Sequence, residues 1–221
     1  MMSKLRFKLD KSIKFMLVKR QGLKMKSTSK LCLKFSMLFF LCAVQNISFS
    51  QQFNQTFDTK NHPKAKGVWA QVSYPEGWTA RETQGANTLQ MFTGTHNEVN
   101  VQLQFLIRDF GVPIENECPN ISESEWDKAT SDASLNIVSS NSKKIKVEGK
   151  PGFLSDTTRL RRTTNPNTSY AGKQLFVCYK TTRILLTCGT TIPEDNLQKA
   201  NTNLSKVDST CNAYFKSIVL K

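Results

Sequence analysis

KQLFVCYK-TT-RILLTCGT, residues 173–190, is the stretch that decides the fold of this chain. It predicts a β-hairpin in which Thr181 and Thr182 form a two-residue loop, so that Lys180 pairs with Arg183. Both strands are nearly continuous apolar runs, which is typical of strands that are buried on both faces. We therefore expect a central sheet with covering layers on both sides.

The hairpin carries two cysteines, and its alternation bears on how they pair. Successive side chains point to opposite faces of a sheet, so Cys178 and Cys188 are expected on opposite faces, and a bond between them would need a bulge. In the two remaining connectivities, Cys118 and Cys211 each bond one hairpin cysteine. Either would link one covering layer to each face of the sheet, and the choice between them stays open.

The first fifty residues predict a targeting segment. They hold 11 of the 31 Lys and Arg residues and one of the 17 Asp and Glu residues, so the other 171 residues carry 20 basic against 16 acidic side chains, a net +4. The apolar run Phe35–Val44 follows three lysines, and small residues precede a cleavage site after Ser50, as in a secretory signal peptide. The run is too short to span a bilayer.

A start at Met25 gives this signal an ordinary length, so residues 1–24 are interpreted as an over-extended reading frame. The alternatives are a genuine extension and a single-pass anchor. Residues 51–66 are expected to form a flexible leader, and residues 67–221 a single domain. We expect an exported protein, periplasmic or secreted, that contacts the membrane only through the uncleaved signal. Export and the low remaining charge argue against nucleic acid as a partner.

Four cysteines remain after the signal, and an even number in an exported chain favours two disulfides. Metal binding is the rival interpretation. The sequence has no C-x-x-C pair, and its histidines are His62 and His96, so we expect neither a metal site nor a cofactor.

Further strands are predicted on both sides of the hairpin. VNVQLQFLI, residues 99–107, alternates apolar and polar residues as a half-buried strand does, and residues 87–94 are its predicted partner. Residues 143–152 and 153–164 are also expected to be extended.

Two helices are predicted. The first covers residues 121–138, with Ser122 as N-cap and Glu125 completing a capping box. The second is one long amphipathic helix over residues 194–215. Together these elements predict an α+β fold, an antiparallel β-sheet between helical layers.

Several motifs outside the hairpin resemble the Mog1/PsbP-like superfamily, above all its small exported PsbP-like bacterial proteins: VSYPEGWTARE, LQMFTG, VNVQLQFLI, KVEGKPG and the closing YFKSIVL. The resemblance covers about Val68–Leu220 and implies an α-β-α sandwich. Members have varied roles, including photosystem II accessory protein and regulator of a small GTPase, so the fold implies no single function. No family site matches positions in this chain, and the resemblance transfers no site residues.

AQVSYPEGWTARE, residues 70–82, has two interpretations. As a structural corner, Pro75 fixes φ, Gly77 tolerates the turn and Trp78 re-enters the core. As a binding site, Tyr74 and Trp78 would form an aromatic platform around a ligand. The corner is favoured, and Tyr74 and Trp78 stay candidate contacts.

RLRR, residues 159–162, is the densest basic patch after the signal. On a strand, Arg159 and Arg161 share one face, and Arg162 lies on the other. The patch predicts either a solvated edge that discourages sheet-to-sheet pairing or a contact for an anionic lipid, a glycan or an acidic partner. The second interpretation makes all three arginines candidate contacts.

Carboxylates cluster around the first predicted helix, at Glu115, Glu117, Glu123, Glu125 and Asp127. The simple interpretation is charge that complements the helix dipole. The sharper one is a cation site, which would need several oxygens to converge. No G-x-S-x-G, P-loop, H-E-x-x-H or S-x-x-K motif with its partners occurs, so the sequence offers no catalytic residue.

These patterns predict a non-catalytic binding or assembly module of a cell-envelope or secreted complex, with an envelope or secreted protein as its partner. Two alternatives stay open. A small cation-dependent enzyme would use the Glu115–Asp127 cluster, and converging carboxylates in a polar cleft would favour it. A small-ligand or lipid carrier would need a sizeable apolar pocket between the sheet and the closing helix.

Overall fold

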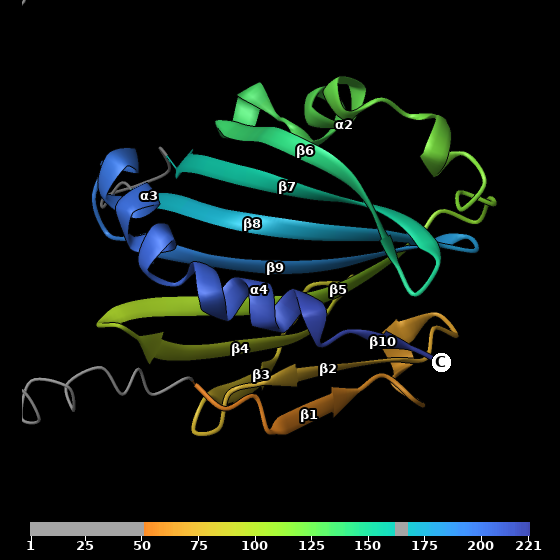
Figure 1. Ribbon diagram of the computed structural model, residues 1–221, viewed down its shortest axis with the longest axis horizontal. Coiled ribbons are helices and arrows are strands. Elements are labelled where there is room, and N and C mark those ends of the chain that lie inside the picture. Colours follow the sequence, from red (N-terminus) through yellow and green to blue (C-terminus); the bar gives the residue numbers. More distant parts are fainter. Residues whose placement is uncertain (1–50, 162–167) are drawn as a thin grey trace, which may run out of the picture. The chain divides into compact units, whose positions relative to one another are not determined.

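The computed structural model describes residues 51–161 and 168–221 (Figure 1). The predicted signal segment, residues 1–50, lies outside this range. The main element is a seven-stranded antiparallel sheet in the order β3-β4-β5-β9-β8-β7-β6. Its strands are β3 (Thr79–Glu82), β4 (Thr88–His96), β5 (Val99–Asp109), β6 (Ile137–Val147), β7 (Lys150–Arg161), β8 (Thr168–Tyr179) and β9 (Thr182–Ile192).

The hairpin predicted from residues 173–190 forms β8 and β9 in the interior of this sheet. Its loop lies one residue earlier than predicted, at Lys180 and Thr181, so Tyr179 pairs with Thr182 and the partner of each residue shifts by two positions. Lys180 adopts the left-handed backbone conformation with φ 54°. Thr182 is buried, and its hydroxyl donates to the Tyr179 carbonyl at 2.8 Å, which draws it into the strand pair.

Two disulfides form, as predicted, and each secures a segment on one face of the sheet. Cys118 bonds Cys178, and Cys188 bonds Cys211. The shifted register still pairs even-numbered with odd-numbered positions, so Cys178 and Cys188 point to opposite faces. The bonded residues are 60 and 23 positions apart. Loop closure of this length stabilises the fold by about 4 and about 3 kcal/mol, respectively.

One face of the large sheet is covered by two helices and a small sheet (Figure 1). The helices are α3 (Leu197–Lys206) and α4 (Asp208–Lys216), and the small sheet contains β1 (Gln55–Asp58), β2 (Ala70–Tyr74) and β10 (Val219–Leu220). Leu103, Phe105 and Ile107 of β5 are fully buried in the apolar layer beneath them. Tyr214 of α4 crosses this layer and donates to the Gln104 carbonyl at 3.1 Å.

The closing helix predicted over residues 194–215 is divided at Val207 into α3 and α4. Val207 has a non-helical backbone, with φ −114° and ψ 12°, and its side chain is completely buried. Packing of this residue into the core therefore takes precedence over helical continuity. Asp208 begins the second helix, where a carboxylate complements the positive end of the helix dipole.

Residues 51–66, expected to be a flexible leader, contain β1 and the short helix η1 (Pro63–Ala65). Phe57 of β1 packs against Phe92 and Phe105, with ring centroids 6.0 Å apart in both pairs. The sequence did not predict this strand, because Phe57 is the one residue of β1 that is not exposed and a single apolar residue shows no alternation.

The opposite face of the large sheet carries α2 (Glu123–Thr130) at one end. The predicted capping box is present, since Ser122 and Glu125 exchange side-chain and backbone hydrogen bonds. Trp126 is buried on this face, where it stacks on Phe153 with ring centroids 4.3 Å apart and meets Phe176 edge-on.

This helix is shorter than the predicted 121–138. The Asp132 carboxylate accepts hydrogen bonds from the backbone of Ser134 and Leu135, which starts the short helix η3 (Ala133–Leu135) instead. Local side-chain-to-backbone bonds of this kind compete with a continuing helix. Ile137 then belongs to β6 rather than to the apolar stripe of a helix.

The chain is thus an α+β protein made mostly of antiparallel sheet, as predicted. The finer prediction of helical layers on both sides is not confirmed, because a small sheet shares one face with α3 and α4, and α2 lies at one end of the other. Within residues 51–161 and 168–221, no helix is long and apolar enough to cross a membrane.

Candidate functional site

The face of the large sheet that carries α2 is polar beyond the end of that helix. Two cavities of about 280 and 180 Å³ hollow it, and both are lined by Gln102 and Thr191. We call this region the polar trough. The smaller cavity is further lined by Gln104, Ile137, Thr157, Arg159, Tyr170, Gln174 and Thr187, and the larger by Thr93, Gly94, Thr95, Asn100 and Val101.

Strand pairing brings these residues together from distant parts of the sequence. Arg159 of β7 lies opposite Tyr170 of β8, and Tyr170 lies opposite Thr191 of β9. Gln102 of β5 lies opposite Gly189 of β9, two residues before Thr191. Paired residues share one face of a sheet, so the polar positions of successive strands form one surface.

Tyr170 lies across the floor of the polar trough. Its ring passes over Gly172 and Gly189, and a Cβ atom on either glycine would overlap the phenol. Glycine inside a strand is destabilising by roughly 0.5–1 kcal/mol, so the sequence accommodates this tyrosine at a cost in stability. Burial raises the pKa of Tyr170 to about 12, against smaller opposing effects of Arg159 and a hydrogen bond with Thr187. The hydroxyl therefore stays protonated near neutral pH.

Arg159 lies over the Tyr170 ring, with its guanidinium carbon 5.6 Å from the ring centroid. Its Nε is buried and has no hydrogen-bond partner among the described residues, and the same holds for Oγ1 of Thr157. A buried polar group without a partner is unfavourable by roughly 1–3 kcal/mol. A ligand that satisfied these two groups would recover that energy on binding.

The chemistry of the polar trough is that of binding. Gln102, Gln104 and Gln174 each offer hydrogen-bond donors and an acceptor, as do the threonine hydroxyls. None of the described residues that line the two cavities is an Asp, Glu, His or Cys. With its phenol protonated, Tyr170 is no general base at neutral pH, so the trough is equipped to hold a hydrogen-bonding, anionic ligand rather than to transfer protons.

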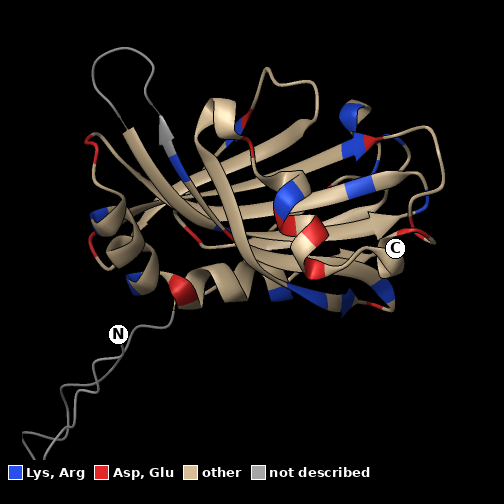
Figure 2. Cartoon of the chain, turned by 90° about the horizontal axis from the view of Figure 1, so that it is seen from above, with Lys and Arg blue, Asp and Glu red and all other residues tan. Residues whose placement is uncertain are grey.

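Arg159 is the residue of the RLRR patch that the structure places in the polar trough. Arg161 ends β7, and its side chain, like the whole of Arg162, lies outside what the structure describes. Since β7 lies between β6 and β8, the interpretation of this patch as a sheet edge does not fit Arg159. Elsewhere, Lys and Arg are spread over helices, strands and hairpin ends among Asp and Glu (Figure 2).

Tyr74 and Trp78 lie in the main core, at the corner between β2 and β3. Tyr74 is half-buried and stacks on Phe92, with ring centroids 4.2 Å apart. Trp78 is 9% exposed and packs directly on Gly94, where a Cβ atom would overlap the indole ring. Both side chains contribute to packing at this corner, on the opposite side of the large sheet from Arg159.

The acidic residues near α2 have separate partners. The Glu115 carboxylate accepts the backbone N–H of Lys180 at 2.8 Å and pairs with Lys150 at 2.9 Å, and these two contacts lower its pKa. The Asp127 carboxylate accepts the hydroxyl of Ser142 at 2.5 Å. Within the part of the chain that the structure describes, no group of three or more His, Cys, Asp or Glu side chains could hold a metal ion.

Glu123 has a structural role that the sequence did not predict. Its carboxylate accepts the backbone N–H of Lys144 at 2.8 Å, on the outer edge of β6. Further along the same edge, the Ser131 hydroxyl accepts the N–H of Ser139 at 2.9 Å. The α2 segment therefore covers an edge strand that would otherwise present unpaired backbone groups.

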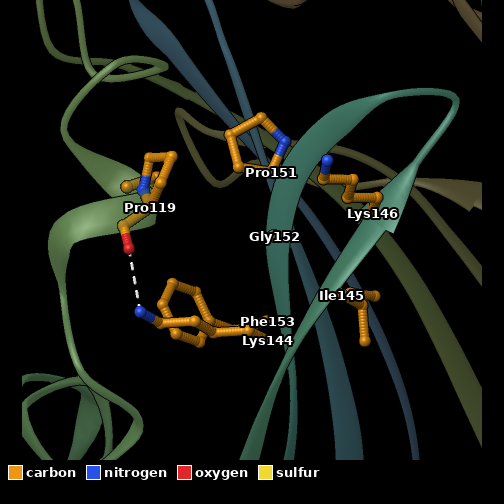
Figure 3. Close-up of a pocket in the computed structure, with 8 residues that line it drawn as sticks. Pro119, Lys144, Ile145, Lys146, Pro151, Gly152 and Phe153 are labelled. Carbon is orange, nitrogen blue, oxygen red and sulfur yellow. Dashed lines mark hydrogen bonds between the residues drawn. The ribbon is translucent and has the colours of Figure 1, made fainter.

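A third cavity, of about 290 Å³, lies between the short helix η2 (Cys118–Asn120) and the β6–β7 hairpin. Figure 3 shows Pro119 and Pro151 on opposite sides of it, with Phe153 below. The Lys144 amine donates to the Pro119 carbonyl at 2.8 Å and so links the two walls. This cavity is mostly apolar, but it does not lie between the sheet and the closing helix, where the lipid-carrier hypothesis places its pocket.

A fourth cavity, of about 560 Å³, lies between α3 and α4 on one side and β7 and β8 on the other. This is where a lipid carrier would need its apolar pocket. The lining is mostly polar, with Asp156 and an ion pair between Lys173 and Asp208, and Leu204 is its one large apolar side chain. Elsewhere, the contact between α4 and the large sheet is filled by Cys211, Tyr214 and other buried side chains.

No family model matches the chain, and no curated protein matches it. Among solved structures, a chain from Bacteroides thetaiotaomicron VPI-5482 is similar to it, with 12% sequence identity and a TM-score of 0.42. The similarity covers 77% of this chain and 49% of that chain, so this chain spans about half the length of that relative.

Proposed function

We propose that this chain is an exported, non-catalytic binding module that holds an acidic glycan of the cell envelope in the polar trough. One observation carries the proposal: the Arg159 guanidinium lies over Tyr170 in a cavity otherwise lined mainly by hydroxyl and amide groups. Amides and hydroxyls form hydrogen bonds with sugar hydroxyls, and a guanidinium binds a carboxylate with charge-assisted bonds.

The length of the polar trough supports an extended ligand. Its residues come from β4, β5, β9, β8, β7 and the first position of β6, which are neighbours in that order. Six strands at the usual spacing span about 24 Å. A chain of linked sugars lying across the strands would contact the amides of β5 and reach Arg159 with an acidic unit.

The energetics of this region argue for binding rather than stability. Gly172 and Gly189 leave room for the Tyr170 ring, but glycine destabilises a strand. Thr157 and Arg159 each bury a polar atom that has no hydrogen-bond partner among the described residues, which is also unfavourable. An apolar packing of the same face would be more stable. This loss of folding stability is explained if the region binds a ligand.

Export rests on the predicted signal peptide and is supported by the two disulfides, which persist in oxidising compartments. Membership of the Mog1/PsbP-like superfamily, with its α-β-α sandwich, belongs to the same proposal and rests on the sequence motifs. The envelope or secreted protein partner predicted from the sequence stays a prediction.

The test measures binding of a galacturonic acid tetramer and of a neutral galactose tetramer to the purified, disulfide-intact protein by calorimetry. We expect saturable binding of the acidic tetramer and clearly weaker binding of the neutral one. Arg159→Gln removes the charge-assisted bonds, and its affinity for the acidic tetramer should fall roughly 10- to 100-fold.

Arg81→Gln is the matched control, because Arg81 is an exposed arginine on β3 of the same sheet, outside the polar trough. It should bind like the unmodified protein. Failure of both tetramers to bind saturably, or equal affinity of Arg159→Gln and Arg81→Gln, would count against the polar trough as a glycan site.

A further inference from the structure

Two arginines lie opposite each other at the far end of the same sheet face. Arg108 of β5 pairs in register with Arg183 of β9. Like charges directly opposite in an antiparallel pair repel each other and destabilise the sheet. Both guanidinium groups lie over one ring, that of Phe110, with their carbons 5.0 and 4.8 Å from its centroid.

The surroundings hold Arg183 in place without neutralising it. Its guanidinium carbon is 4.7 Å from the Trp126 ring and 5.8 Å from the Phe176 ring, in addition to the contact with Phe110. The Phe110 backbone N–H donates to the Thr181 carbonyl at 3.0 Å, which anchors the shared ring beside the β8–β9 loop. Burial, and secondarily the charge of Arg108, lower the pKa of Arg183.

No carboxylate compensates these two charges within the described residues. None lies within 4.0 Å of either guanidinium, and Nε of Arg183 is buried without a hydrogen-bond partner. Asp109 follows Arg108 in sequence, but it alternates to the other face of β5 and accepts the N–H of Gly111 at 3.0 Å. Four lysines elsewhere pair with carboxylates, among them Lys150 with Glu115.

We infer that Arg108 and Arg183 form a binding site for a phosphate or sulfate oxyanion, with Phe110 as its apolar wall. Guanidinium groups present planar arrays of N–H donors that match the oxygens of such an anion. An oxyanion there would turn the repulsion between two opposed cations into attraction to a shared partner. The site faces solvent through Arg108, whose side chain is exposed.

This oxyanion site is separate from the polar trough. Arg183 and Thr187, the nearest residue of β9 that lines the polar trough, are four positions apart. At the usual rise per residue, this separation is about 13 Å. The inference therefore stands whether or not the polar trough binds a glycan.

The test titrates the disulfide-intact protein with inorganic phosphate at low salt by calorimetry, and follows the Arg183 Nε–H signal by NMR. We expect saturable binding that shifts this signal. Arg108→Gln and Arg183→Gln should each weaken binding roughly tenfold or more. Arg108 is exposed, so its variant keeps the test valid if Arg183→Gln does not fold.

One control separates this site from other positive charges. Arg81→Gln changes an exposed arginine elsewhere in the large sheet, outside the polar trough. It should bind phosphate like the unmodified protein. If phosphate does not saturate, or if Arg108→Gln and Arg183→Gln bind like this control, the inference is wrong.

A second experiment identifies the source of the oxyanion. Vesicles of phosphatidylcholine, with or without phosphatidylglycerol, are sedimented with the protein. Retention by the anionic vesicles that Arg108→Gln abolishes would assign the site to a lipid headgroup. Phosphate binding without such retention would assign it to a free oxyanion. Without saturable phosphate binding, the site is overturned whatever the vesicles retain.

Discussion

The two faces of the large sheet use the same strands in different ways. On β5, Leu103 and Phe105 are fully buried beneath α4 and the small sheet, whereas Gln102 and Gln104, which alternate with them, point to the opposite face. The first face is apolar and packed, and the second is polar and hollowed. Stability explains the first arrangement, and the second is the basis of the binding role that we propose.

The polar face is itself divided. Near the β8–β9 loop, Trp126, Phe153 and Phe176 form a small apolar cluster under α2, and Arg183 lies against it. Further along the strands, the polar trough begins. Aromatic packing therefore fixes α2 and the oxyanion site at one end, while the middle of the same face stays accessible.

The largest expected effect comes from the disulfides, which secure one segment on each face. The double variant Cys118→Ala/Cys178→Ala should lose about 4 kcal/mol of unfolding free energy, and Cys188→Ala/Cys211→Ala about 3 kcal/mol, because the first bond closes the longer loop. Urea unfolding of each variant measures this order. The reverse order would mean that packing of Cys188 and Cys211 in the core outweighs loop closure.

The next effect compares two adjacent residues of β5. Leu103→Ala removes a fully buried side chain and should lower the free energy of unfolding by about 3 kcal/mol. Gln102→Ala, on the polar face, should lower it by less than about 1 kcal/mol. Equal losses in urea unfolding would show that the polar face contributes as much to stability as the core, which would weaken the case for a binding surface.

The sequence predicted those features that depend on local pattern. Alternation in residues 99–107 located β5, and the continuous apolar runs of residues 173–190 located β8 and β9. The opposite facing of Cys178 and Cys188 followed from alternation, and it was preserved because the predicted register differs from the observed one by an even number of residues, two. The capping box of Ser122 and Glu125 depends on four consecutive residues and was equally visible.

Features that depend on contacts between distant residues could not be predicted from the sequence. Gln102 and Gln104 were visible as the polar side of a strand, which looks the same in sequence whether it faces solvent or a ligand site. Their proximity to Arg159 and Tyr170 depends on the strand order β5-β9-β8-β7, which no local pattern encodes. The division of the closing helix at Val207 has the same origin, because contacts of that residue with the core decide it.

The smallest effect compares one tyrosine from each face, the buried Tyr214 of the core and the half-buried Tyr170 of the polar trough. Burial raises the pKa of Tyr214, in the apolar core, well above its usual value, whereas Arg159 and Thr187 partly offset the rise for Tyr170, whose pKa is about 12. Unfolded tyrosine ionises near pH 10, so above that pH the folded state holds more protons than the unfolded state, and the free energy of unfolding falls as pH rises. Tyr170→Phe and Tyr214→Phe should each remove roughly 1 kcal/mol of this loss at pH 11, because ionisation of the unfolded tyrosine limits the loss at that pH. Urea unfolding at pH 8 and pH 11 measures the loss of unfolding free energy between these two pH values for each variant.

The contradicting outcome is that Tyr170→Phe loses as much unfolding free energy between pH 8 and pH 11 as the unmodified protein. The Tyr170 phenol would then not be enclosed. The floor of the polar trough would be more open to water than its contacts with Gly172 and Gly189 imply.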